Sequence, residues 1–110
     1  PQDLEVKNNL AMTYLSSNNP MQGILMLREV LAADAKNETA LFNLGMLSIQ
    51  SGQFDNAIER LNTLIGLNPQ HIQAQLLLGV AYMQSGDKVK AKSQFEKVKD
   101  MDKDPSVQAT

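Results

Sequence analysis

The chain repeats itself every 34 residues. Residues 4–37, 38–71 and 72–105 align without a gap, and similar side chains recur in the same columns, for example Leu10, Leu44 and Leu78. A fixed period of this length is typical of stacked structural units, each of which buries its apolar face against its neighbours. The period therefore predicts a repeat array, a kind of protein that offers an extended surface to a partner.

Each unit divides into two amphipathic helices joined by a turn. Apolar side chains recur at helical spacing on both sides of the turn, and the turn column holds Asn18, Gly52 and Gly86, which tolerate a positive φ at a helix C-terminus. Pro69 disfavours helical geometry at Asn68 and so ends the second unit. No stretch alternates with a period of two. The sequence predicts an all-α chain with helices over 4–17, 20–33, 38–51, 54–67, 71–85 and 88–101.

Small residues indicate where the two helices of a unit approach each other. A glycine inside a helix costs about 1 kcal/mol relative to alanine, so glycine at equivalent sites one period apart indicates a helix–helix contact that offsets this cost. One such column lies in the first helices and one in the second helices: Ala11, Gly45 and Gly79, and Gly23, Ala57 and Ala91.

At these columns the chain resembles the tetratricopeptide repeat family. The stretch LFNLGMLSIQSGQFDNAIERLNTLIGLNP has the family's Leu-Gly pair, mid-unit Gly, later Ala and closing Pro, and LLLGVAYMQSGDKVKAKSQFEKV matches better still. The first unit departs most, with Ala11, Gly23 and Ala35 in place of the usual Gly, Ala and Pro. The resemblance implies a right-handed superhelical solenoid of three antiparallel helix pairs, whose first helices line a concave face.

We expect a single domain over residues 1–110, in which 106–110 begin a truncated capping helix or a further repeat. The absence of an initial Met suggests a piece of a longer protein, with a signal, an anchor or more repeats outside it. The compartment stays open between the cytoplasm and a periplasmic or membrane-anchored setting. The gapless match and the Gln- and Asn-rich surface resemble bacterial members of the family.

The sequence argues against catalysis and against nucleic-acid binding. His71 is the only histidine and is expected in the first turn of the fifth helix, and there is no cysteine, so neither a metal nor another cofactor is predicted. The net charge of −2 lacks the basic excess of a nucleic-acid binder. Lysines gather in the last helix, but acidic residues alternate with them, as on a solvated face. We expect a non-enzymatic chain without direct membrane contact.

The resemblance assigns the groove-facing positions column by column. Positions 5, 9 and 12 of the three units form a stripe in which eight of nine side chains are apolar: Asn8, Met12, Leu15, Phe42, Met46, Ile49, Leu76, Val80 and Met83. Exposed apolar patches of this extent usually mark interaction sites. The other groove columns are largely polar and include Asn9, Thr39, Asn43 and Gln73. Asn43 is expected either to bond a bound backbone or to bond a neighbouring helix.

Members of the family that clamp a C-terminal carboxylate use Lys, Asn and Arg at five of these columns. Here those columns hold Asn8, Met12, Asn43, Gln73 and Leu77, and only Asn43 fits. A carboxylate receptor is therefore rejected.

We expect a protein-interaction module or scaffold that binds an apolar or amphipathic peptide segment in the concave groove. The alternative is self-association, in which a second copy or a missing C-terminal cap helix buries the same groove. An accessory module fused to an enzyme or an anchor is compatible with either.

Overall fold

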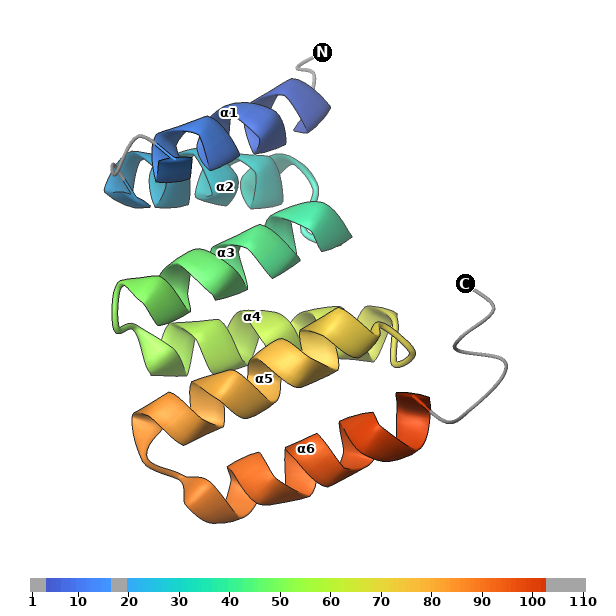
Figure 1. Ribbon diagram of the computed structural model, residues 1–110. Helices are drawn as coiled ribbons and strands as arrows, with labels where there is room; N and C mark the ends of the chain where they lie inside the picture. Colours follow the sequence, from blue (N-terminus) through green and yellow to red (C-terminus); the bar gives the residue numbers. More distant parts are fainter. Residues whose placement is uncertain (1–3, 17–19, 103–110) are drawn as a thin grey trace.

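Three helix pairs follow one another in a stack in the computed structural model, which describes residues 4–16 and 20–102 (Figure 1). These residues form α1 (Leu4–Ser16), α2 (Pro20–Ala33), α3 (Glu38–Gln50), α4 (Phe54–Leu67), α5 (Ile72–Ser85) and α6 (Lys88–Asp102), and no strand. Each helix begins and ends within one residue of its predicted bounds. The all-α prediction is confirmed.

Two of the three turns within the pairs contain a glycine in the left-handed region. Gly52 has φ 80° and Gly86 has φ 95°, backbone conformations that residues other than glycine rarely adopt. Asn18, predicted for the same role in the first unit, lies outside the described residues. Asn68 has φ −144° and ψ 83°, so α4 has ended before Pro69, as the sequence predicts.

Side chains also cap the N-termini of two of the first helices. The Asn37 Oδ1 atom accepts a hydrogen bond of 2.9 Å from the backbone N–H of Ala40, and the His71 Nδ1 atom accepts one of 3.1 Å from that of Ala74. Asn37 and His71 are thus the N-caps of α3 and α5. The expectation that His71 lies within the first turn is wrong by one residue, because its ring bonds back to that turn from outside it.

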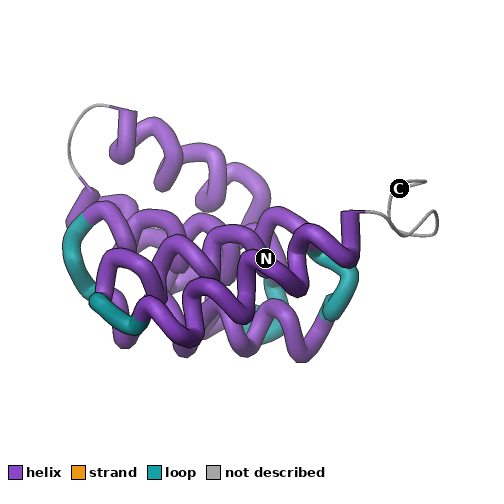
Figure 2. The backbone as a smooth tube through the Cα atoms, turned by 60° about the horizontal axis from the view of Figure 1, so that its bottom comes forward, coloured by secondary structure: helices purple, strands orange, loops and turns teal. Residues whose placement is uncertain are grey.

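Consecutive helices contact each other along the chain, and α1 also contacts α3, as α3 does α5. The first helices of the three units therefore form a continuous layer, and Figure 2 shows the described connections at the two ends of the helices. Side chains from both helices of the units fill the space between them, and the largest of the fully buried apolar ones are Ile24, Leu27, Leu41, Leu47, Leu61 and Leu64.

The small residues lie where paired helices approach most closely. A Cβ atom built on Gly45 would be 2.9 Å from both Cγ and Cδ2 of Leu61, and one on Gly79 would be 2.6 Å from Cε1 of Phe95. At Gly23 it would be 3.0 Å from the carbonyl oxygen of Ala11. The predicted contact between helices at these columns is confirmed.

We predict that Gly45→Ala lowers the free energy of unfolding by about 1–3 kcal/mol, because Leu61 is fully buried and has no space into which to move. The matched control is Gly66→Ala on α4, where an added Cβ meets nothing within 4 Å. That substitution should stabilise by roughly 0.5–1 kcal/mol through helix propensity alone. Urea unfolding followed by circular dichroism measures both, and equal stabilisation by the two substitutions would contradict the contact.

Candidate binding surface

The predicted groove residues all lie on α1, α3 and α5, the layer of first helices. We call their side chains the first-helix surface: Asn8, Met12, Phe42, Asn43, Met46, Ile49, Gln73, Leu76, Val80 and Met83. Leu15 belongs to the same prediction, but its side chain lies outside the described residues. The ten described side chains differ widely in how much surface they offer.

The α5 portion of the surface is the most exposed. Leu76 is 45% exposed and Met83 46%, Gln73 is also exposed, and Val80 between them is half-buried. Residues 73, 76, 80 and 83 follow the spacing of one helix face. No Asp, Glu, Lys or Arg occurs anywhere in α5. This helix therefore presents an uncharged and largely apolar stripe to solvent.

The α3 portion is more deeply set. Phe42 and Met46 are half-buried, while Asn43 and Ile49 are buried and Ile49 belongs to the core. Ile49 and Asn43 therefore offer a partner little surface in this conformation. Among the described residues, the Asn43 side chain makes no hydrogen bond to a neighbouring helix. Its contact with a bound backbone stays a prediction.

Phe42 stacks on the ring of His71, with 5.5 Å between the ring centroids and 21° between their planes. His71 thus has two contacts: its Nδ1 atom caps α5 and its ring covers one side of Phe42. Sequence reasoning missed the second contact, because the two residues are 29 positions apart. The cap had a signal in the sequence, since His71 directly precedes the apolar pattern of α5.

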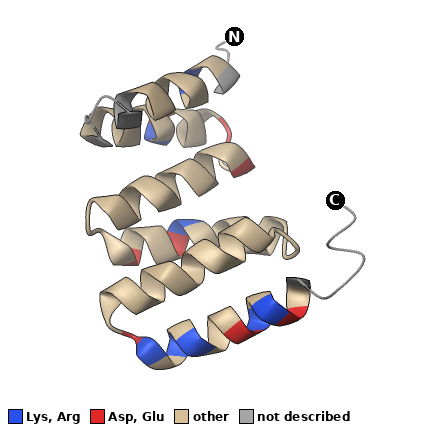
Figure 3. Ribbon diagram, in the orientation of Figure 1, with Lys and Arg blue, Asp and Glu red and all other residues tan. Residues whose placement is uncertain are grey.

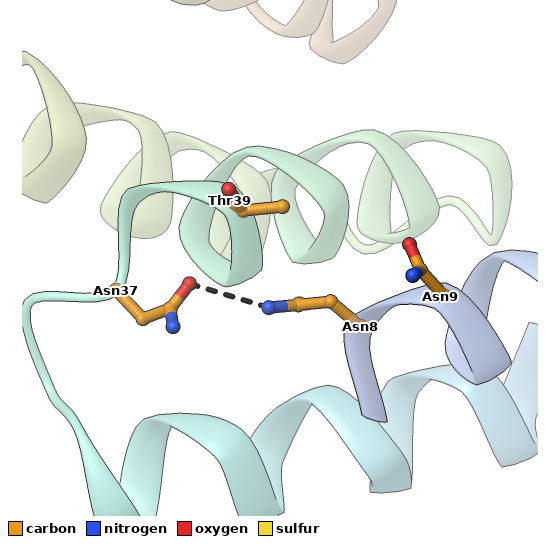
Figure 4. A pocket seen from close by; sticks show the side chains of 4 residues that line it. All are labelled: Asn8, Asn9, Asn37 and Thr39. Atoms are coloured by element: carbon orange, nitrogen blue, oxygen red, sulfur yellow. Dashed lines mark hydrogen bonds between the residues drawn. The ribbon is translucent and has the colours of Figure 1, made fainter. Parts of the chain in front are cut away.

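The α1 portion is half-buried at Met12 and polar at Asn8. Asn8 is only 4% exposed, and its Nδ2 atom donates a hydrogen bond of 3.4 Å to Oδ1 of Asn37. A pocket of about 370 Å³ opens here, lined by Asn8, Asn9, Asn37 and Thr39 (Figure 4). Asn37 is the lining residue that the groove columns do not include.

Charge is unevenly distributed between the helices (Figure 3). Of the first helices, α5 carries no charged residue, α3 carries only Glu38 and α1 carries Glu5 and Lys7, whereas α6 carries five lysines together with acidic residues. Lys7 on α1 pairs with Glu29 on α2 at 3.4 Å. The first-helix surface can thus recognise apolar or neutral polar groups, and it lacks the cations that a carboxylate would require.

The described residues include no helix long and apolar enough to cross a membrane. In the same part of the chain, no three His, Asp or Glu side chains gather as a metal site would require.

A sequence model of the tetratricopeptide repeat matches residues 22–70 and 48–110. The chain therefore belongs to the tetratricopeptide repeat family. The human protein O-mannosyl-transferase TMTC3 is 29% identical over 103 residues, which are 93% of this chain and only 11% of that protein.

Solved structures agree with the family assignment. A crystal structure of MamA superposes with a TM-score of 0.85 at 27% identity, covering 92% of this chain and 59% of that one. YrrB, described as a TPR protein with an unusual peptide-binding site, superposes with a TM-score of 0.86 at 20% identity, covering 97% and 55%. The chain is a right-handed superhelical solenoid of helix pairs, a fold that supports protein–protein interaction.

We predict that His71→Ala lowers the free energy of unfolding by about 1–2 kcal/mol, because it removes both the cap of α5 and the ring against Phe42. His71→Asn restores a capping oxygen without an aromatic ring, so it should recover about half of that loss. Urea unfolding of the three proteins gives the comparison. If His71→Asn were as unstable as His71→Ala, the capping role would be refuted.

Proposed function

We propose that this chain is a non-enzymatic scaffold that binds an uncharged, apolar or amphipathic peptide segment along the first-helix surface. The observation that carries the proposal is the α5 stripe, in which Leu76 and Met83 are nearly half exposed on a helix without a single charge. Contiguous apolar patches exposed to water are uncommon on monomeric proteins and usually mark interaction sites, so this stripe favours a partner that covers it. The partner is a protein or peptide, and not a nucleic acid.

The neighbouring side chains suit the same partner. Phe42 and Val80 are half-buried against the core and Met46 is half-buried, so the three would form the floor under a bound apolar side chain. The thioethers of Met46 and Met83 adapt to apolar groups of different shape. With few exposed anchors, we expect affinity on the order of micromolar, or about −8 kcal/mol.

A second candidate function is self-association. Leu10, Met21 and Leu25 on the first helix pair are 40%, 55% and 47% exposed. Leu44 and Leu78, which share a column with Leu10, are buried. An apolar area at this end of the stack favours contact with a second copy of the chain, or with another helix pair.

The distant likeness to TMTC3, a transferase by name, does not favour catalysis here, because the match spans only 11% of that protein. Within the described residues, His71 is held by a cap and a ring stack and faces no carboxylate or nucleophile in any described contact.

The proposal is tested with peptides selected from a random display library against the wild-type protein. The double variant Leu76→Glu/Met83→Glu should weaken their binding at least tenfold, because two carboxylates would have to lose water against apolar side chains. Both sites are well exposed, so the fold should survive, which circular dichroism checks. The substitutions Phe42→Glu and Met46→Glu are less informative, because both side chains are half-buried and Phe42 packs against the core.

The matched control is Val89→Glu on α6, where an 81% exposed apolar side chain lies outside the first-helix surface. Its peptide affinity should equal that of the wild type. Peptides that bind the double variant as tightly as the control would refute the first-helix surface as the site. Sedimentation over a range of concentrations separates the two functions: a monomer supports the peptide site, and a dimer abolished by Leu10→Glu or Leu25→Glu supports self-association.

A further inference from the structure

The last helix differs from the second helices before it in the columns that face a following unit. α2 packs between α1 and α3, and α4 between α3 and α5, whereas α6 packs against α5 and no described helix follows it (Figure 1). Three apolar residues of α4 pack against the core: Phe54, Ile58 and Ile65. One period later, α6 has three exposed lysines in the same columns: Lys88, Lys92 and Lys99.

These lysines lie on one side of α6. With 3.6 residues per turn, positions 88, 92 and 99 fall within about 40° of one another around the helix axis, and Phe95 falls beside them. Phe95 is half-buried, because one side of its ring packs on Gly79 while its column mates Leu27 and Leu61 are fully buried. We call Lys88, Lys92, Phe95 and Lys99 the α6 end face.

The α6 end face carries positive charge that no described carboxylate pairs with. Within residues 4–16 and 20–102, the ion pair on this helix joins Lys90, from another side of α6, to Asp87 at 4.0 Å. Glu96 lies at the edge of the face by helical spacing, yet it forms no ion pair with Lys92 or Lys99. The face therefore offers three cations around one partly exposed aromatic ring.

We infer that the α6 end face docks an acidic amphipathic helix of a partner protein. A helix fits because the same columns of α2 and α4 lie against helices, α3 and α5. The ring of Phe95 and the methylene stems of the lysines cover an apolar stripe, and the ammonium groups meet Asp or Glu beside that stripe. Residues 88–99 rise roughly 16 Å along α6, so the partner helix needs about 12 residues to reach all three lysines.

This chain does not carry such a helix in a free form. Residues 103–110 read KDPSVQAT, with one carboxylate and one large apolar residue, Asp104 and Val107. A second copy would offer α1, which has one acid and one base, Glu5 and Lys7. The inference goes beyond the proposed function, since the α6 end face shares no residue with the first-helix surface and selects by charge, which that surface does not.

The test uses three helical peptides of about 18 residues, long enough to form isolated helices. They share one leucine stripe and carry Glu, Gln or Lys beside it. Fluorescence anisotropy at about 50 mM salt should show the Glu peptide binding at least tenfold more tightly than the other two, and less than threefold more tightly at about 500 mM salt. A permuted Glu peptide without the stripe should bind at least fivefold more weakly. Equal affinities for the Glu and Lys peptides, or for the permuted peptide, would overturn the inference.

Two matched double variants locate the site. Lys92→Gln/Lys99→Gln and Lys90→Gln/Lys97→Gln remove the same charge from exposed positions seven apart, but the second pair lies about 160° around the helix from the first. The first variant should weaken the Glu peptide at least fivefold, and the second less than twofold. Equal losses would mean general attraction to a basic helix and would overturn the inference. Circular dichroism checks that both variants stay folded.

Charge reversal gives a gain-of-function readout. Lys92→Glu/Lys99→Glu should exchange the preference, so that the Lys peptide binds more tightly than the Glu peptide. An unchanged preference would overturn the inference.

Other occupants of the face would also overturn it. A single-stranded oligonucleotide or an anionic vesicle that binds more tightly than the Glu peptide, and that Lys92→Gln/Lys99→Gln releases, would be one such result. A dimer in sedimentation that this variant abolishes would be another. Uncharged peptides selected on the first-helix surface should bind this variant as tightly as the wild type, so either proposal can fail without the other.

Discussion

The close approach of the two helices in each unit is the contact on which the rest of the structure depends. This contact requires a residue with almost no side chain on one helix of the pair. Gly45 is that residue against Leu61, and Gly79 is that residue against Phe95. Once each pair is fixed in this way, the pairs stack in chain order and α1, α3 and α5 come to lie in one layer. The first-helix surface is therefore a consequence of packing on the opposite side of the same helices.

The helices and their order could be predicted from the sequence because the repeat supplies three readings of each position. Gly52 and Gly86 show why this works: one column needs a positive φ, and the residue type reveals it twice. Depth of burial was not predictable in the same way. Leu10, Leu44 and Leu78 share a column, yet Leu10 is 40% exposed while the other two are buried. Among the described helices, α2 packs against α3 and α4 against α5, which covers Leu44 and Leu78.

The same limit applies to the binding surface. The column assignment gives the helix on which a residue lies, but not how much of that residue the neighbouring unit covers. It therefore treats Ile49 and Met83 alike, although Ile49 is buried and Met83 is nearly half exposed. Contacts between units are also invisible in a single column. The stack of Phe42 on His71 and the bond from Asn8 to Asn37 each join residues 29 positions apart, and no column contains both partners.

The distribution of charge then determines how such a surface can select a partner. Lysines and carboxylates are concentrated on α6, where they solvate the last helix, and α5 has none. Selection by ion pairs is thus excluded along most of the first-helix surface, and an apolar stripe alone discriminates poorly between apolar ligands.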